Sequence, residues 1–182
     1  MKKTEIKELI KCNISDKNLC VVNFRYDYNW FGFPLASSDK LFLGLVEDDF
    51  ITDGYTIRRF VDATKARVKS DKCYEILQKE GIISNIQNPN IDVTNWETVF
   101  KSLEQRGKNV IVEHESLDED DGEFIIGRIV GVYKKFVYIH HFDVDGIWMD
   151  EPYKVLYSEI TSVTFGSRYV DIFSRYLDVP SQ

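Results

Sequence analysis

Residues 124–177 read FIIGRIVGVYKKFVYIHHFDVDGIWMDEPYKVLYSEITSVTFGSRYVDIFSRYL. Apolar and polar residues alternate through most of this stretch, and turn signals interrupt it at Lys134-Lys135 and at Asp145-Gly146. Ser167 then precedes residues 169–177, which are expected to form the last helix. The stretch therefore predicts several short antiparallel strands that end in a C-terminal helix.

A shorter version of this stretch lies at residues 41–81. Gly44 in LGLV corresponds to Gly127 in IGRI, and Asp53-Gly54 corresponds to Asp145-Gly146. The two glycines of each copy are closer together in the first copy than in the second. We therefore expect the first copy to lack about one strand and one turn, or to have them in a reshaped form. Residues 29–40, which contain a glycine and a proline, are expected to form a long connection.

The most specific match between the copies is an acidic residue, any residue and a threonine. Residues 62–64 and residues 159–161 both follow this pattern, and a serine stands six residues after each threonine, at Ser70 and Ser167. A helix is predicted after each serine, because serine is a preferred helix N-cap. The shared order and spacing indicate an internal duplication, whereas the alternative is chance similarity between amphipathic strands.

Three parts of the chain follow from this pattern. Residues 1–81 form the first, shortened repeat, residues 82–93 a linker broken at Asn88-Pro89, and residues 94–182 the fuller second repeat. The second repeat is expected to open with a helix whose capping box is TNWE, residues 94–97. The linker isoleucines are expected to be buried between the repeats.

The predicted fold is mainly β with flanking helices, as two tandem small barrels or strongly bent antiparallel sheets. A helix followed by about five bent strands, with Gly127 and Gly131 in the second strand, resembles the Sm-like and SH3-like small-barrel class. The resemblance is one of pattern, over residues 96–165 and more loosely over residues 19–68. The Asp and Asn of an Sm-type RNA site would fall on Tyr133 or Lys134 and on Val137, so the resemblance does not imply that site.

Composition restricts the function classes. Thirty acidic and 23 basic residues among 182 give a formal charge of −7, which opposes general affinity for nucleic acid or anionic membranes.

The three cysteines form no CxxC pair and indicate free thiols in a reducing compartment. No apolar run approaches the ~20 residues of a membrane-spanning helix. We expect a cytoplasmic protein with no cofactor and no membrane partner; an oligomer is compatible with the edge strands of small barrels.

An acidic segment between two predicted strands is the densest charged feature. It comprises Glu115, Asp118, Glu119, Asp120, Asp121 and Glu123. Three interpretations remain open: a solvated hairpin loop, a surface for a basic partner, and a cation site, although the spacing does not match an EF-hand.

A basic segment in the first copy offers an alternative surface. It comprises Arg58, Arg59, Lys65, Arg67 and Lys69. If these side chains share one face, they could contact phosphates of single-stranded RNA or another nucleic acid. The other interpretation is an ordinary solvent-exposed face.

Catalytic constellations are missing from the sequence. Neither a GxSxG elbow nor a GxxxxGK[ST] loop occurs, and no metal site is predicted. His114 or His140 with nearby carboxylates could form a hydrolase site only if they line one pocket. The leading hypothesis is therefore a non-enzymatic binding module, immunity- or adaptor-like, that binds a protein through the acidic segment; nucleic-acid binding through the basic segment is the alternative.

Overall fold

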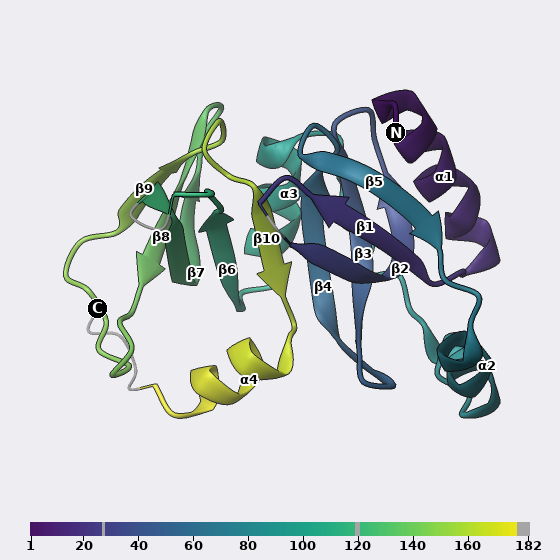
Figure 1. The fold of residues 1–182 in the computed structure, drawn as a ribbon. Helices are drawn as coiled ribbons and strands as arrows, with labels where there is room; N and C mark the ends of the chain where they lie inside the picture. The colour runs from purple at the N-terminus through teal and green to yellow at the C-terminus, as the bar shows by residue number, and fades with distance from the viewer. Residues whose placement is uncertain (27, 119–120, 178–182) are drawn as a thin grey trace.

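A computed structural model describes residues 1–26, 28–118 and 121–177. In this part of the chain, ten strands form one antiparallel sheet that is not closed, and four α-helices pack around it (Figure 1). The prediction of a mainly β fold with flanking helices is confirmed.

The first half of the chain contains one helix, five strands and a closing helix. Its elements are α1 (Lys3–Asp16), β1 (Cys20–Phe24), β2 (Asn29–Ser37), β3 (Leu41–Asp48), β4 (Ile51–Arg59), β5 (Ala63–Val68) and α2 (Lys72–Lys79). A short 3-10 helix, η1 (Ile83–Asn85), follows.

The second half has the same order of helices and strands: one helix, five strands and a closing helix. Its elements are α3 (Trp96–Glu104), β6 (Asn109–His114), β7 (Glu123–Val132), β8 (Phe136–His141), β9 (Tyr153–Leu156), β10 (Ser162–Phe165) and α4 (Arg168–Arg175).

The strands follow the order β5-β1-β2-β3-β4-β10-β6-β7-β8-β9 across the sheet. When the strands of each half are numbered in chain order, both halves have the same arrangement. The fifth strand lies beside the first, and the second, third and fourth strands follow in turn. The two halves join where β4 pairs with β10, antiparallel, from Arg58↔Ser162 to Tyr55↔Phe165. β5 and β9 are the two edges of the sheet.

The prediction that the first copy lacks a strand is wrong. Residues 29–37, expected to be part of a connection, form β2, so each half has five strands. Pro34 was evidence against a strand, because proline has no backbone N–H to donate a hydrogen bond to a neighbouring strand. The register of β2 against β3 shifts between Pro34 and Ala36, and such irregular positions are where a sheet tolerates proline. By strand order Gly127 in β7 therefore corresponds to Gly32 in β2, and the pairing of Gly127 with Gly44 in β3 is wrong.

Two helix caps lie one residue later than predicted. The cap of α3 is Asn95, whose side-chain oxygen accepts a hydrogen bond from the Thr98 amide at 3.1 Å. Thr94 is instead held outside the helix, because its amide donates to the Asp92 carboxylate. The cap of α2 is Asp71 rather than Ser70. Ser167 caps α4 as expected.

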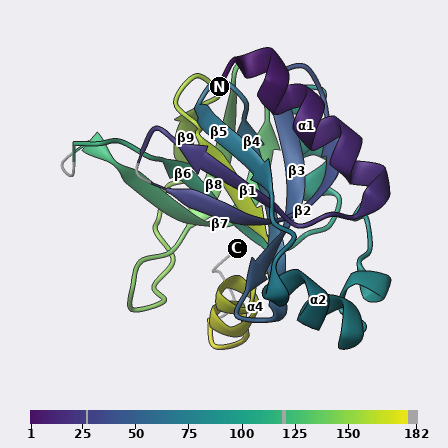
Figure 2. The same ribbon diagram turned by 45° about the vertical axis from the view of Figure 1, so that its right-hand side comes forward.

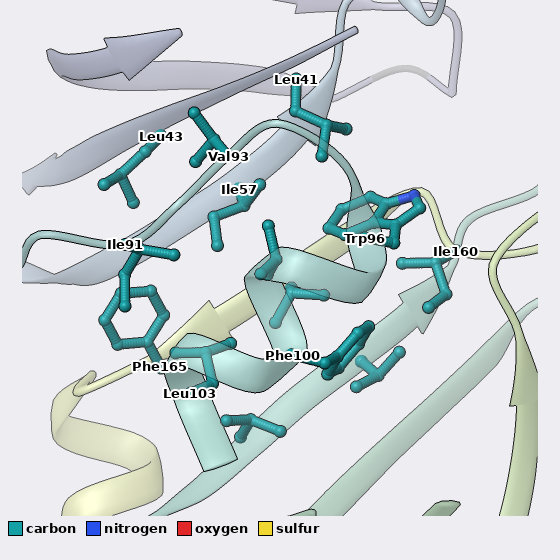
Figure 3. Packing of buried hydrophobic residues seen from close by; sticks show 14 of the residues in the cluster. Leu41, Leu43, Ile57, Ile91, Val93, Trp96, Phe100, Leu103, Ile160 and Phe165 are labelled. Carbon is teal, nitrogen blue, oxygen red and sulfur yellow. The ribbon is translucent and has the colours of Figure 1, made fainter. Parts of the chain in front are cut away.

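The largest core surrounds α3, which lies between the two halves. Trp96, Val99, Phe100 and Leu103 of this helix belong to the same buried cluster as Leu41, Leu43 and Ile57 of the first half and Ile160 and Phe165 of the second (Figure 3). Segment 82–93 adds Ile86, Ile91 and Val93 to this cluster, while Ile82 and Ile83 pack against it partly buried. The halves therefore share one core.

Two smaller cores lie beneath the other helices. Ile6 and Ile10 of α1 pack on a cluster that contains Trp30, Phe42 and Phe60. Val170 of α4 packs on Ile111, Ile126 and Phe142. One helix therefore covers each half away from the shared core.

Candidate functional site

The two threonines of the matched acidic-x-Thr pattern make the same hydrogen bond in each half. The Thr64 hydroxyl donates to the carbonyl of Asn23 in β1 at 3.0 Å. The Thr161 hydroxyl donates to the carbonyl of Glu113 in β6, also at 3.0 Å. Each threonine thus connects the start of the fifth strand to the first strand of its own half by a hydrogen bond. Thr161 also accepts a hydrogen bond from the Glu115 amide.

A buried ion pair connects the two halves beside the junction of β4 and β10. Arg58 of β4 donates from both terminal nitrogens to the carboxylate of Glu115, which follows β6, at 2.9 to 3.1 Å. The Arg58 side chain is only 4% exposed and that of Glu115 17% exposed. Paired charges of this geometry are strong and directional. Arg58 from the predicted basic surface and Glu115 from the predicted acidic surface therefore neutralise each other.

Aromatic rings complete the surroundings of Arg58. Its guanidinium lies 4.1 Å from the ring centre of Tyr28 and 4.7 Å from that of Phe24. Burial raises the pKa of the Tyr28 phenol, and the nearby positive charge of Arg58 opposes that shift. These contacts hold the β1–β2 connection against the junction.

Glu113 lies in the same polar cluster. Its carboxylate accepts a hydrogen bond of 2.5 Å from the Ser162 hydroxyl of β10. Burial raises the pKa of Glu113 above its ordinary value, although the Ser162 hydrogen bond and Arg58 act in the opposite direction. Glu113, Glu115, Arg58 and Ser162 thus join β4, β6 and β10 through polar contacts, in an arrangement suited to holding the halves together.

Three further residues of the acidic segment, Asp118, Asp121 and Glu123, lie towards the end of the β6–β7 hairpin, which projects from the body of the molecule (Figure 2). Asp118, Asp121 and Glu123 are exposed, and Glu123 accepts a hydrogen bond from the Tyr153 hydroxyl. Glu119 and Asp120 lie outside the described residues. Two large apolar side chains flank these acids: Leu117 is 69% exposed and Phe124 is 56% exposed.

The basic segment is divided by the fold. Arg58 is buried in the ion pair with Glu115. Arg59 pairs with Asp62 at 2.5 Å and donates a hydrogen bond to the Ser158 carbonyl. Lys65 and Arg67 are exposed on β5, and Lys69 lies over the ring of Phe31. Three of the five predicted cations therefore remain on the β5 edge.

In the part of the chain that the structure describes, His114 and His140 lie at separate places in the sheet. His114 lies opposite Glu123 near the start of β7, whereas His140 lies opposite Arg128, further along that strand. His140 Nε2 is 2.8 Å from the carbonyl oxygen of Met149. Within residues 1–26, 28–118 and 121–177, no group of three or more His, Cys, Asp or Glu side chains is arranged to hold a metal ion.

One surface feature was not identified from the sequence. A largely apolar groove of about 630 Å³ runs along α4, where Tyr169, Ile172 and Tyr176 are exposed beside Gly146 and Asp53. The signal was present, because those three residues are spaced by three and four positions and so share one helix face.

Comparison of the chain with known protein families, with curated proteins and with solved structures finds no match. In the part of the chain that the structure describes, every helix is too short or too polar to span a lipid bilayer.

Proposed function

We propose that this protein is a binding module that recognises a basic protein partner through the end of its β6–β7 hairpin. The observation that carries the proposal is the exposure of Leu117 and Phe124 on either side of the acidic residues. Large exposed apolar side chains surrounded by charge are typical of recognition surfaces, where the apolar groups supply affinity and the charges supply selectivity.

The base of this hairpin is suited to presenting such a surface. Glu115 is held by Arg58 from the first half and by Thr161 through its amide. A surface that is already ordered loses less conformational entropy on binding. The ion pair removes Glu115 itself from the binding surface, so Asp118, Asp121 and Glu123 supply the negative charge.

Affinity capture from a native lysate tests this proposal. The wild-type chain should retain a basic protein that is released as the salt concentration rises, because contacts between exposed charges are screened. The double variant Leu117→Ser and Phe124→Ser should lose that protein. Val144→Ser is the matched control, since Val144 is also exposed but lies in the β8–β9 connection. Capture of the same proteins by the wild type and the double variant would contradict the proposal.

Nucleic-acid binding is the second candidate, and the cluster of Lys65, Arg67 and Lys69 along the β5 edge supports it. Binding of single-stranded RNA at this edge should weaken steeply with salt, and Lys65→Glu with Arg67→Glu should abolish it. Lys134→Glu, an exposed lysine in the β7–β8 turn, is the control. The absence of RNA binding at low salt would eliminate this candidate.

We also infer that the two halves are diverged copies of one small barrel. The shared strand order and the equivalent hydrogen bonds of Thr64 and Thr161 support this inference. In a crystal structure of the protein, the five strands of one half should superpose on those of the other in the same order. Opposed curvature of the two sets of strands would contradict the inference.

A further inference from the structure

A pocket of about 440 Å³ lies beside the start of α1, in the first half of the molecule. Three parts of the chain line it: the first two turns of α1, the β2–β3 connection, and the end of β4 with the turn that leads into β5. The described lining residues are Lys3, Lys7, Asp39, Lys40, Arg59, Phe60 and Val61. A volume of this size is typical of sites for small molecules.

The charge of this pocket is opposite in sign to that of the whole molecule. Four of its seven lining residues are cationic and only Asp39 is acidic, although the chain carries a formal charge of −7. Among the described residues, no carboxylate forms an ion pair with Lys3, Lys7 or Lys40. Like charges held close together repel one another, so an anion bound among them would remove an unfavourable interaction.

The buried carboxylate next to the pocket does not neutralise this positive charge. Asp62 is only 1% exposed and pairs with two guanidinium groups, that of Arg25 at 2.7 Å and that of Arg59 at 2.5 Å. Its single negative charge is therefore already matched by two positive charges. Arg59 also donates hydrogen bonds to the Ser158 carbonyl and to the Tyr26 hydroxyl, which fix the position of its side chain.

Two apolar side chains supply the rest of the pocket lining. Val61, in the turn between β4 and β5, is 59% exposed. The ring of Phe60 is buried, and the Lys7 ammonium lies 5.8 Å from its centre. The Phe60 amide donates a hydrogen bond to the Lys40 carbonyl at 2.9 Å, so the turn is attached to the β2–β3 connection. An apolar group beside Val61 would remove the exposed surface of that side chain from water.

We propose that this pocket binds a small soluble phosphate monoester that carries an apolar or aromatic group. Near pH 7 such a phosphate carries about 1.5 to 2 negative charges, so it matches the excess of cations better than a carboxylate does. Lysine ammonium groups bind phosphate as point charges, and the apolar group contacts Val61. The formal charge of −7 opposes adsorption of the protein to an anionic membrane, which favours a free ligand over a lipid headgroup.

Calorimetric titration of the full chain with three probes tests the class of ligand. Phenyl phosphate has a dianionic phosphate and a ring, benzoate has a ring with one charge, and inorganic phosphate has no ring. Phenyl phosphate should bind roughly tenfold more tightly than either of the others, because it alone uses both the cations and the apolar lining. Equal affinities for phenyl phosphate and inorganic phosphate would refute the proposal, as would no binding of phenyl phosphate at millimolar concentrations.

Two variants determine whether binding takes place in this pocket. Lys7→Gln combined with Lys40→Gln removes two ammonium groups and should weaken the binding of phenyl phosphate by roughly tenfold. Val61→Ser should weaken the binding of phenyl phosphate by roughly threefold and leave that of inorganic phosphate unchanged, because Val61 contacts only the apolar group. The circular dichroism spectrum of each variant confirms that the fold is intact. Unchanged affinity of the double variant for phenyl phosphate would contradict the proposal.

Lys134→Gln combined with Lys135→Gln is the matched control. Both lysines are exposed in the turn between β7 and β8, so this variant has the same change in net charge at a distant place in the fold. It should bind phenyl phosphate as tightly as the wild type. Equal weakening in the two double variants would show that binding follows the net charge of the protein and would overturn the proposed pocket.

Two further probes test other molecules that contain phosphate. Vesicles of phosphatidic acid should leave the protein in the supernatant after sedimentation. Sedimentation that the variant of Lys7 and Lys40 abolishes would identify a lipid headgroup and contradict a soluble ligand. An oligouridylate that binds more tightly than phenyl phosphate, and that this variant no longer binds, would assign the cations to nucleic acid and overturn the proposal. None of these results bears on the β6–β7 hairpin, because Leu117 and Phe124 do not line the pocket.

Discussion

Arg58 and Glu115 form a bidentate ion pair across the junction between the two halves of the molecule. Each residue was expected to lie on a separate binding surface, one basic and one acidic. Their contact instead makes them part of the structural connection, alongside the backbone pairing of β4 with β10. Asp118, Asp121 and Glu123 of the acidic segment and Lys65 and Arg67 of the basic segment are exposed.

Removal of one member of this pair should destabilise the protein strongly. Arg58→Ala leaves the Glu115 carboxylate without its partner, so the free energy of unfolding should fall by about 3–5 kcal/mol. Urea denaturation measures this loss. Lys72→Ala is the control: Lys72 pairs with Glu75 on the surface of α2, and its loss should cost less than about 1 kcal/mol. Equal losses in the two variants would contradict a structural role for Arg58.

Glu113 should make stability depend on pH. Its pKa in the folded protein is raised by burial, so the folded state favours the protonated form. The stabilisation from that proton is complete below the pKa that Glu113 has in the unfolded chain. It is lost as the pH rises through the pKa that Glu113 has in the folded protein. Glu113→Gln should therefore stabilise the protein at neutral pH, and this gain should disappear towards the ordinary glutamate value of 4.5. Thermal unfolding over this range tests the sign; a gain that grows at low pH would refute it.

The two equivalent threonines should differ in their contribution to stability. Thr161→Val removes a donor to Glu113 and an acceptor of the Glu115 amide in a buried setting, and should cost about 2 kcal/mol. Thr64→Val removes a single hydrogen bond at an exposed position and should cost about 0.5–1 kcal/mol. Chemical denaturation of the two variants gives the comparison. A larger loss for Thr64→Val would contradict these assignments.

Gly127 should not tolerate a side chain. A Cβ atom at this position would lie 2.1 Å from the carbonyl oxygen of His140 and 2.6 Å from the Cα of His141, so β7 and β8 would have to separate. Gly127→Ala should lower the free energy of unfolding by about 3 kcal/mol, the upper end of ordinary overpacking. Gly122→Ala is the control, because its Cβ would meet only the His114 carbonyl oxygen, at 3.6 Å. Unchanged stability of Gly127→Ala would show that the strands can move apart.

Local signals predicted much of the second half. Alternation identified β7 and β8, Asp145-Gly146 identified a turn whose glycine has φ of +80°, and Ser167 identified the start of α4. These features depend on residues close together in the chain. In the first half, β2 was missed because Pro34 is normally a signal against a strand, and only the irregular pairing with β3 accommodates it.

The contact between halves could not be predicted in the same way. Arg58 and Glu115 are far apart in the sequence, and nothing near either residue indicates that β4 pairs with β10. An arginine in a strand is more often exposed, so Arg58 was placed on the surface with its neighbours. Asp118, Asp121 and Glu123 are exposed at the end of the β6–β7 hairpin, and Lys65 and Arg67 are exposed on β5, an edge strand of the sheet.

The pairing of β4 with β10 also constrains the order of events on the ribosome. Arg58 pairs with Ser162, which is synthesised more than a hundred residues later. Strands β1 to β5 can pair with one another as soon as they emerge, but β4 then waits with one edge unpaired until nearly the whole chain has been made. The apolar face formed by Leu41, Leu43 and Ile57 is likewise uncovered until α3 emerges. An unpaired edge beside an apolar face is a site of misassembly. The chain therefore most needs protection from aggregation while its first half has been synthesised and its second half has not.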